Sequence, residues 1–181
     1  MSLTNTPARY GSLSLGMHWL MALLLVAVYC CMELREFYPK GSDPRNALKA
    51  WHYTLGITVF LLVWLRLVLR LVQRTPTIEP PAPTWQTLLS KAVHLGLYVL
   101  MIGMPIVGWL LMNGEGKGVT AWGVELPVLI AKDKALAHTL EEIHEIGANA
   151  GYALVAVHTA AALFHHYFVR DNTLLRMLPG R

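Results

Sequence analysis

The stretch that decides the fold runs from residue 144 to residue 166 and reads HEIGANAGYALVAVHTAAALFHH. From Ile146 to Val169 the chain has 24 residues without a charged side chain, and about 20 apolar residues are enough for a helix to cross a bilayer. His144 and His158 are 14 residues apart, so on a helix they lie about 21 Å apart along the axis and on nearly the same face. This stretch therefore predicts a membrane-spanning helix with one histidine in each leaflet.

Three further charge-free runs precede this one. They cover Leu13–Met32 (20 residues), Ala50–Leu65 (16 residues) and Ala92–Gly114 (23 residues). The second run is short, but Arg66 and Arg70 follow it at helical spacing and can reach the interface while their apolar neighbours lengthen the span. The composition agrees, because 55% of the residues are hydrophobic and only 14% are charged, whereas about a quarter is charged in soluble domains.

These runs predict an all-α fold, an integral-membrane four-helix bundle formed by a single domain over residues 1–181. We expect helices at about 10–33, 46–71, 86–113 and 141–169, with an outer loop over 114–140. Eight Lys and Arg residues fall on the side of the two termini and seven on the other side. This small bias favours cytoplasmic termini, and the modest net charge of +4 gives no sign of a nucleic-acid partner.

Histidines are unusually frequent in the predicted helices. Ionisable residues inside membrane helices are costly and commonly mark function. Metal transport or a proton relay would favour carboxylates among the histidines, and the four charge-free runs contain no Asp or Glu. Neutral imidazoles in an apolar bundle suit haem iron. Seven of the eight histidines lie in or at the ends of the four helices: His18, His52, His94, His144, His158, His165 and His166.

Depth in the membrane suggests how these histidines pair. His52 pairs with His144 on the outer side, and His18 pairs with His158 on the inner side, so the bundle is expected to hold two haems. Small residues near the ligands, Gly56 and Gly151 among them, would leave room for a flat macrocycle. Close packing of two helices is the alternative explanation of these glycines, and an interhelical hydrogen bond is the alternative for any single histidine.

At this point the chain resembles the bacterial cytochrome b-561 family, which is related to the cytochrome b subunits of nickel hydrogenases. The resemblance covers nearly the whole chain. It rests on Arg9-Tyr10, His18-Trp19, Trp51-His52 with Gly56, His94 with Tyr98, His144 through His158 to His165-His166-Tyr167, and the tail DNTLLRMLPG.

The resemblance implies a dihaem b-type electron carrier of the bacterial inner membrane, with multiple spans and iron protoporphyrin IX as cofactor. It makes His18, His52, His144 and His158 the axial ligands of the haem iron, in agreement with the pairing by depth. Small single-subunit members of the family oxidise superoxide at the periplasmic side and reduce ubiquinone.

Other residues are candidates for contacts with substrates. His165 shares a helical face with His158, and together with His94 or Arg74 it could bind a quinone; bonding to a haem propionate, or an alternative ligand role, is the competing interpretation. Arg45 and Lys49 form a basic pair before His52 that could bind an anion, a propionate or a lipid phosphate. No residue is assigned a catalytic role.

Three functions are therefore open. The first is an oxidoreductase that moves electrons from superoxide to ubiquinone. The second is a membrane cytochrome b subunit that connects a soluble periplasmic dehydrogenase or hydrogenase to the quinone pool. The third is a histidine-rich transporter without haem. A b-type absorption spectrum separates the third function from the first two.

Overall fold

The structure is a computed structural model that describes residues 2–178. Met1 and residues 179–181 lie outside it, and with them Arg181 and the last two residues of the tail motif.

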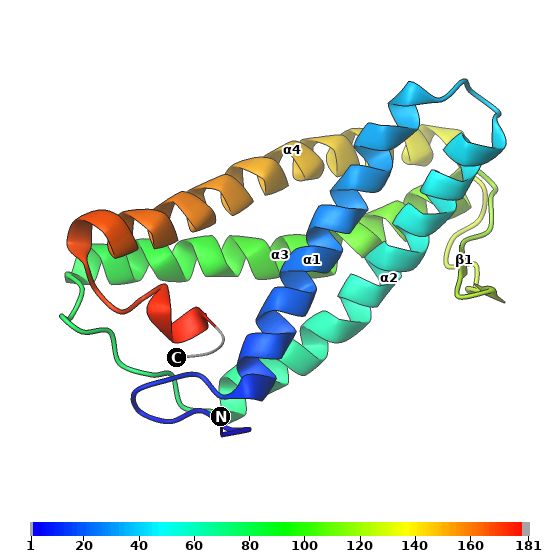
Figure 1. Ribbon diagram of the computed structural model, residues 1–181. Helices are drawn as coiled ribbons and strands as arrows, with labels where there is room; N and C mark the ends of the chain where they lie inside the picture. The colour runs from blue at the N-terminus through cyan, green and yellow to red at the C-terminus, as the bar shows by residue number, and fades with distance from the viewer. Residues whose placement is uncertain (1, 179–181) are drawn as a thin grey trace. The chain divides into compact units, whose positions relative to one another are not determined.

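Four long helices account for most of the chain (Figure 1). They are α1 (Ser12–Leu34), α2 (Asp43–Val72), α3 (Thr84–Gly114) and α4 (Lys134–Phe164). A 3₁₀ turn, η1 (Arg35–Phe37), follows α1, and a π-helical turn, η2 (His165–Val169), continues α4. A short hairpin of β1 (Thr120–Ala121) and β2 (Val124–Glu125) lies between α3 and α4, and a 3₁₀ turn, η3 (Leu175–Met177), follows η2.

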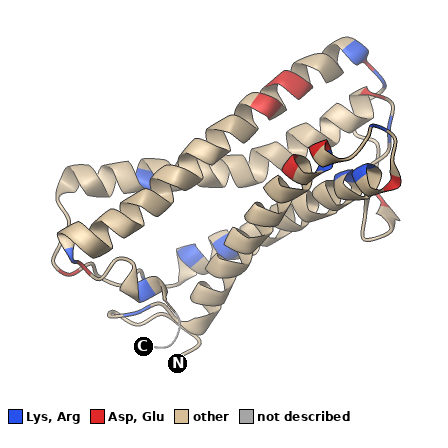
Figure 2. Cartoon of the chain, turned by 45° about the horizontal axis from the view of Figure 1, so that its top comes forward, with Lys and Arg blue, Asp and Glu red and all other residues tan. Residues whose placement is uncertain are grey.

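All four long helices can cross a membrane. Counted with the turns that extend them, they comprise 26, 30, 31 and 36 residues and are apolar enough to span. Figure 2 shows long uncharged stretches in each helix, with most charged residues near helix ends and in loops. A chain that buries its backbone polar groups in lipid must form helices of this kind, because no water satisfies them there. The predicted all-α, four-helix membrane fold is confirmed.

The described residues group into two compact units, and each unit takes part of every long helix. Within the described residues, unit 1 comprises residues 2–20, Trp64–Tyr98 and residues 150–178, and unit 2 comprises Met21–Val63 and Val99–Asn149. The expectation of a single domain stays a prediction.

In unit 1 the N-terminal segment, the proline-rich linker after α2 and the C-terminal tail are tied by hydrogen bonds. Asn5 donates its side-chain amide to the carbonyl of Arg74, and its backbone N–H bonds Gln73. Asn172 accepts from the N–H of Glu79 and donates its own N–H to the Glu79 carbonyl. The Trp19 indole N–H, on α1, bonds the Met177 carbonyl at 2.8 Å. These bonds satisfy polar backbone that has no regular structure of its own.

In unit 2 the hairpin turns at Trp122 and Gly123, both of which have positive φ angles of 50° and 78°. Such a pair is typical of the type I′ turns that join two-residue hairpins. Asn113, only 3% exposed at the end of α3, accepts from the N–H of Leu129 and so holds the segment after the hairpin.

Helix α4 begins at Lys134, earlier than the expected start near residue 141, so the connection after α3 is shorter than the loop expected over 114–140. The cause is an N-terminal cap, which the charge-free runs do not reveal. The carboxylate of Asp133 accepts hydrogen bonds from the N–H groups of Ala135 and Leu136, both at 3.0 Å. This occupies two of the N–H groups that a helix start leaves free.

Candidate functional site

Unit 2 brings together His52 from α2 and His144 from α4. Their ring centroids are 6.1 Å apart and their planes make an angle of 76°. The Nδ1 atom of His52 lies 3.1 Å from the Val28 carbonyl, and because a carbonyl only accepts, Nδ1 must carry the proton. In a neutral ring this leaves Nε2 unprotonated. Such a bond to a carbonyl fixes the tautomer and ring orientation of a metal-binding histidine.

His144 is held differently. Its Nδ1 atom is buried and has no hydrogen-bond partner of good geometry among the described residues, and the nearest candidate is the Met104 backbone. Gly108 on α3 provides the space for this ring, because a Cβ atom at that position would lie 3.1 Å from Cε1 of His144. On the other side of the pair, a Cβ atom at Gly56, one turn after His52, would meet no atom within 4 Å. Open volume therefore lies beside the His52 face of α2.

Unit 1 brings together three histidines. His18 from α1 and His158 from α4 have ring centroids 6.2 Å apart with an interplanar angle of 56°. His94 from α3 lies 5.4 Å from His158, and its Nδ1 atom is 3.3 Å from the hydroxyl of Ser90. Gly151, one of the expected small residues, is buried in α4. The expected pair is thus close together, with His94 as a third ring beside it.

A cation lies at this unit 1 cluster. The Nη2 atom of Arg66, on α2, is 3.0 Å from the Nδ1 atom of His18. Its charge also acts on His94 and His158. From sequence alone Arg66 is expected at the membrane interface, and its spacing gives no sign of a contact with the histidines.

His165, a predicted quinone residue, is bonded to a carboxylate in the tail. Its Nδ1 atom lies 2.5 Å from Oδ2 of Asp171, whose side chain is fully buried. Burial by itself would raise the pKa of Asp171, but the hydrogen bonds from His165 and from the Thr173 N–H outweigh it and hold this pKa below its ordinary value. Asp171 is therefore ionised at neutral pH and accepts the proton on Nδ1 of His165, which leaves Nε2 for another partner.

The other predicted quinone residue, Arg74, is exposed. In the part of the chain that the structure describes, no hydrogen bond or ion pair joins its guanidinium to His94 or His165.

The two basic residues before His52 differ. Arg45 is only 7% exposed, and it donates to the carbonyls of Arg35 and Tyr38 and to the carboxylate of Glu36. It thereby closes the turn between α1 and α2. Lys49 is half-buried one turn further on. Contact of either residue with an anion or a propionate stays a prediction.

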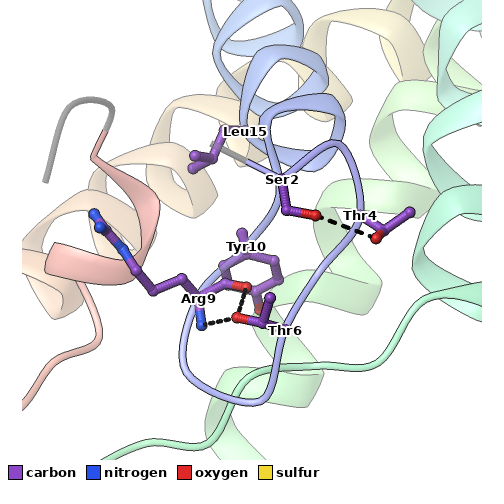
Figure 3. A pocket seen from close by; sticks show the side chains of 6 residues that line it. All are labelled: Ser2, Thr4, Thr6, Arg9, Tyr10 and Leu15. Carbon is purple, nitrogen blue, oxygen red and sulfur yellow. Dashed lines mark hydrogen bonds between the residues drawn. The ribbon is translucent and has the colours of Figure 1, made fainter.

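Two cavities lie in the polar part of unit 1. The first, of ≈ 140 Å³, is bordered by the N-terminal segment and the start of α1, and Figure 3 shows Thr6 bonded to Arg9 at its wall. The second, of ≈ 240 Å³, is lined by Ala8, Arg9, Asn172, Leu175 and Arg176. No histidine lines either cavity, so neither is part of the histidine clusters.

The sequence of the chain matches the model of one protein family, prokaryotic cytochrome b561, over residues 9–180. The chain belongs to this family. Among its relatives, cytochrome b561 homolog 1 of Escherichia coli K12 is 37% identical over 96% of this chain and 98% of its own length. A protein of Yersinia pestis described as probable superoxide oxidase CybB is 35% identical over 96% of this chain and 97% of its own length. Cytochrome b561 homolog 2 of E. coli K12 is 30% identical over 98% and 95%.

Membership of the cytochrome b561 family confirms the resemblance and establishes a multi-pass bacterial membrane cytochrome that binds b-type haem and transports electrons. It argues against the histidine-rich transporter without haem.

The histidine pairs fit this cofactor. With a metal–nitrogen bond of about 2 Å and about 1.2 Å from each nitrogen to its ring centre, two imidazoles on opposite sides of one metal ion have centroids about 6.4 Å apart. The observed separations are 6.1 and 6.2 Å. A direct N–H···N hydrogen bond of about 2.9 Å would bring the centroids to about 5.3 Å, close to the 5.4 Å between His94 and His158. Both expected pairs are therefore spaced for a metal ion.

The Gly108 contact gives a test of how His144 is positioned. Gly108→Ala places a methyl group against this ring and should displace it, so the purified cytochrome should carry less haem and show an altered low-spin spectrum. The matched control is Gly103→Ala on the same helix, where a Cβ atom meets nothing within 4 Å. Equal haem content in Gly108→Ala and the wild type, measured as pyridine haemochrome, would contradict the positioning role.

Proposed function

We propose that this cytochrome is a dihaem electron carrier that takes electrons from superoxide in the periplasm and delivers them to ubiquinone in the bacterial inner membrane. In this proposal His52 and His144 are the axial ligands of one haem, and His18 and His158 are those of the other. Each bound haem supplies one-electron redox chemistry. The observation that carries the proposal is the recurrence of one geometry, a histidine pair with centroids about 6 Å apart, in each of the two units.

The ligand set itself favours electron transfer. Two histidines would hold each haem iron, and iron held by two imidazoles would serve electron transfer and not oxygen binding. The bond from Nδ1 of His52 to the Val28 carbonyl keeps Nε2 available for iron and raises the basicity of the ring. The pair in unit 2 is thus prepared for binding without a change of tautomer at His52.

The overall reaction balances with two superoxide ions. Each loses one electron and becomes O₂, and ubiquinone gains two electrons and two protons to become ubiquinol. The oxidation of superoxide to O₂ breaks no covalent bond, so the protein needs no nucleophile or other covalent catalyst where superoxide reacts. The description of the Yersinia pestis relative as a probable superoxide oxidase supports superoxide as the donor.

We assign His165 the role of proton donor to ubiquinone. Its Nδ1 proton is held by Asp171. In the imidazolium form His165 carries a second proton on Nε2, and this is the proton that can bond a quinone carbonyl and pass to it. His94 and Arg74 are the further candidates for this quinone site. We place both termini, and with them this site, on the cytoplasmic side of the inner membrane.

The alternative function is a cytochrome b subunit that passes electrons between a soluble periplasmic dehydrogenase or hydrogenase and the quinone pool. It uses the same histidine pairs. What distinguishes it is the donor, because such a subunit would accept electrons only from its protein partner.

Stopped-flow spectroscopy with purified protein decides between these donors. After mixing with superoxide, the haem should become reduced on the stopped-flow timescale. Added ubiquinone should then reoxidise the haem, with ubiquinol as product. The control is superoxide that has first been exposed to superoxide dismutase. Absence of haem reduction by superoxide, in protein that dithionite reduces fully, would favour the subunit function.

Replacement of single ligands tests the pairing. The wild type should contain two haems per chain, and His52→Ala or His144→Ala should contain one and should lose reduction by superoxide but still exchange electrons with ubiquinol. His18→Ala should also contain one haem, with the opposite result. Because His94 lies beside His158, haem loss in His94→Ala with full retention in His158→Ala would show that the pair in unit 1 is wrongly assigned.

His165→Ala tests proton delivery. It should retain both haems and its reduction by superoxide, while ubiquinol formation slows by about 10²-fold, the usual contribution of a general acid. Asp171→Asn should fall between the wild type and His165→Ala, because it weakens the bond that orients the ring. Unchanged ubiquinol formation in His165→Ala would remove this residue from the quinone site.

A further inference from the structure

The hydrogen bond between Arg66 and His18 conflicts with iron binding by His18. A guanidinium group only donates hydrogen bonds, so Nδ1 of His18 must accept the bond from Nη2 of Arg66 at 3.0 Å. In a neutral imidazole the proton then sits on Nε2. Protonated Nε2 cannot bind a metal ion, and Nδ1 is already occupied. The bond to Arg66 and ligation by His18 therefore exclude each other.

The pair in unit 2 has no such conflict. His52 donates from Nδ1 to the Val28 carbonyl, which is the arrangement that ligation through Nε2 requires. If His18 is to bind haem iron in unit 1, its tautomer and its hydrogen bond to Arg66 must change, whereas His52 in unit 2 needs no such change. Nδ1 of His18 has to become a donor, and Arg66 has to find another acceptor.

Among the described residues, His18 is the hydrogen-bond partner recorded for the Arg66 guanidinium. Arg66 is half-buried in the membrane-spanning part of α2, and its charge acts on the three histidines of unit 1. Within residues 2–178 no carboxylate forms an ion pair with it. An unpaired guanidinium in this environment is costly, so an anion that enters with the cofactor would be bound strongly.

Haem b brings two carboxylates as its propionate groups, and a guanidinium binds a carboxylate with two parallel hydrogen bonds. We propose that Arg66 leaves His18 when haem binds in unit 1 and pairs with a propionate of that haem. The exchange frees Nδ1 of His18 to carry a proton, makes Nε2 available for iron and neutralises the buried charge. This inference rests on the proposed ligand role of His18 and His158.

By the same reasoning Arg45 is not the equivalent residue in unit 2. Its Nη1 and Nη2 atoms already donate to two carbonyls and to the carboxylate of Glu36. Of the Arg45 guanidinium, only the buried Nε–H lacks a partner among the described residues, so a propionate there would find a single donor and not the two-pronged one. At Arg66 no carboxylate of the described residues stands in its way.

The experiment compares Arg66→Gln with Arg70→Gln in the full-length, haem-loaded cytochrome. Arg70 lies one turn further along α2, is exposed and makes no hydrogen bond among the described residues, although its charge also acts on His94. Both changes remove the same charge. Two quantities are measured in detergent: the midpoint potentials of the haems by redox titration of the α band, and the rate of haem transfer to excess apomyoglobin.

In Arg66→Gln we expect one of the two midpoint potentials to fall, because the propionate charge near the iron loses its partner. Haem loss from that site should become faster by about tenfold or more, since a buried charge pair has lost one member. Arg70→Gln should change both quantities less. Arg66→Lys keeps the charge but lacks the two-pronged donor, so its potential should stay near that of the wild type while haem loss becomes intermediate.

Equal potentials and equal rates of haem loss in Arg66→Gln and Arg70→Gln would overturn the inference. If Arg66→Gln does not accumulate as folded protein, wild-type rates of haem loss in Arg66→Lys would overturn it as well. A failure of the underlying ligand assignment is seen separately, as two retained haems in His18→Ala.

Discussion

An imidazole inside a membrane has two ring nitrogens and no water to satisfy them, and the arrangement of both units follows from this constraint. His52 places one nitrogen on a backbone carbonyl, His94 places one beside a serine hydroxyl, and His18 places one on a guanidinium. In each case the second nitrogen is left for another group. His52 and His18 each lie beside a histidine of α4, with ring centroids 6.1 and 6.2 Å apart.

Space around the rings is as important as their bonds. Gly108 permits the position of His144, and Gly56 leaves volume on the face of α2 that carries His52. Gly147 has a different role, because a Cβ atom there would overlap the side chain of Met104, so it serves close packing of α3 and α4. The glycines of these helices therefore divide between space beside the histidine rings and helix contact, which spacing in the sequence alone does not distinguish.

The features that were predictable from sequence depend on local pattern. Charge-free runs located the four spans, and the 14 residues between His144 and His158 suggested one ligand for each of two sites. The start of α4 differs from the expectation because its first turns lie outside the charge-free run, and the cap that begins the helix comes from a single side chain, Asp133. The contacts of Arg66 with His18 and of Asp171 with His165 join residues from different elements or from a tail without regular structure. No periodicity in the sequence could have indicated them.

The position of α4 as the last long helix also has a consequence for biosynthesis. Each proposed haem takes one ligand from this helix, His144 or His158, so neither site can be complete while only the first three helices have left the ribosome. The tail that follows is equally late, and it supplies the partners of Trp19 and Glu79. In the proposed dihaem arrangement, both sites would therefore reach their full set of ligands only after α4 has been made.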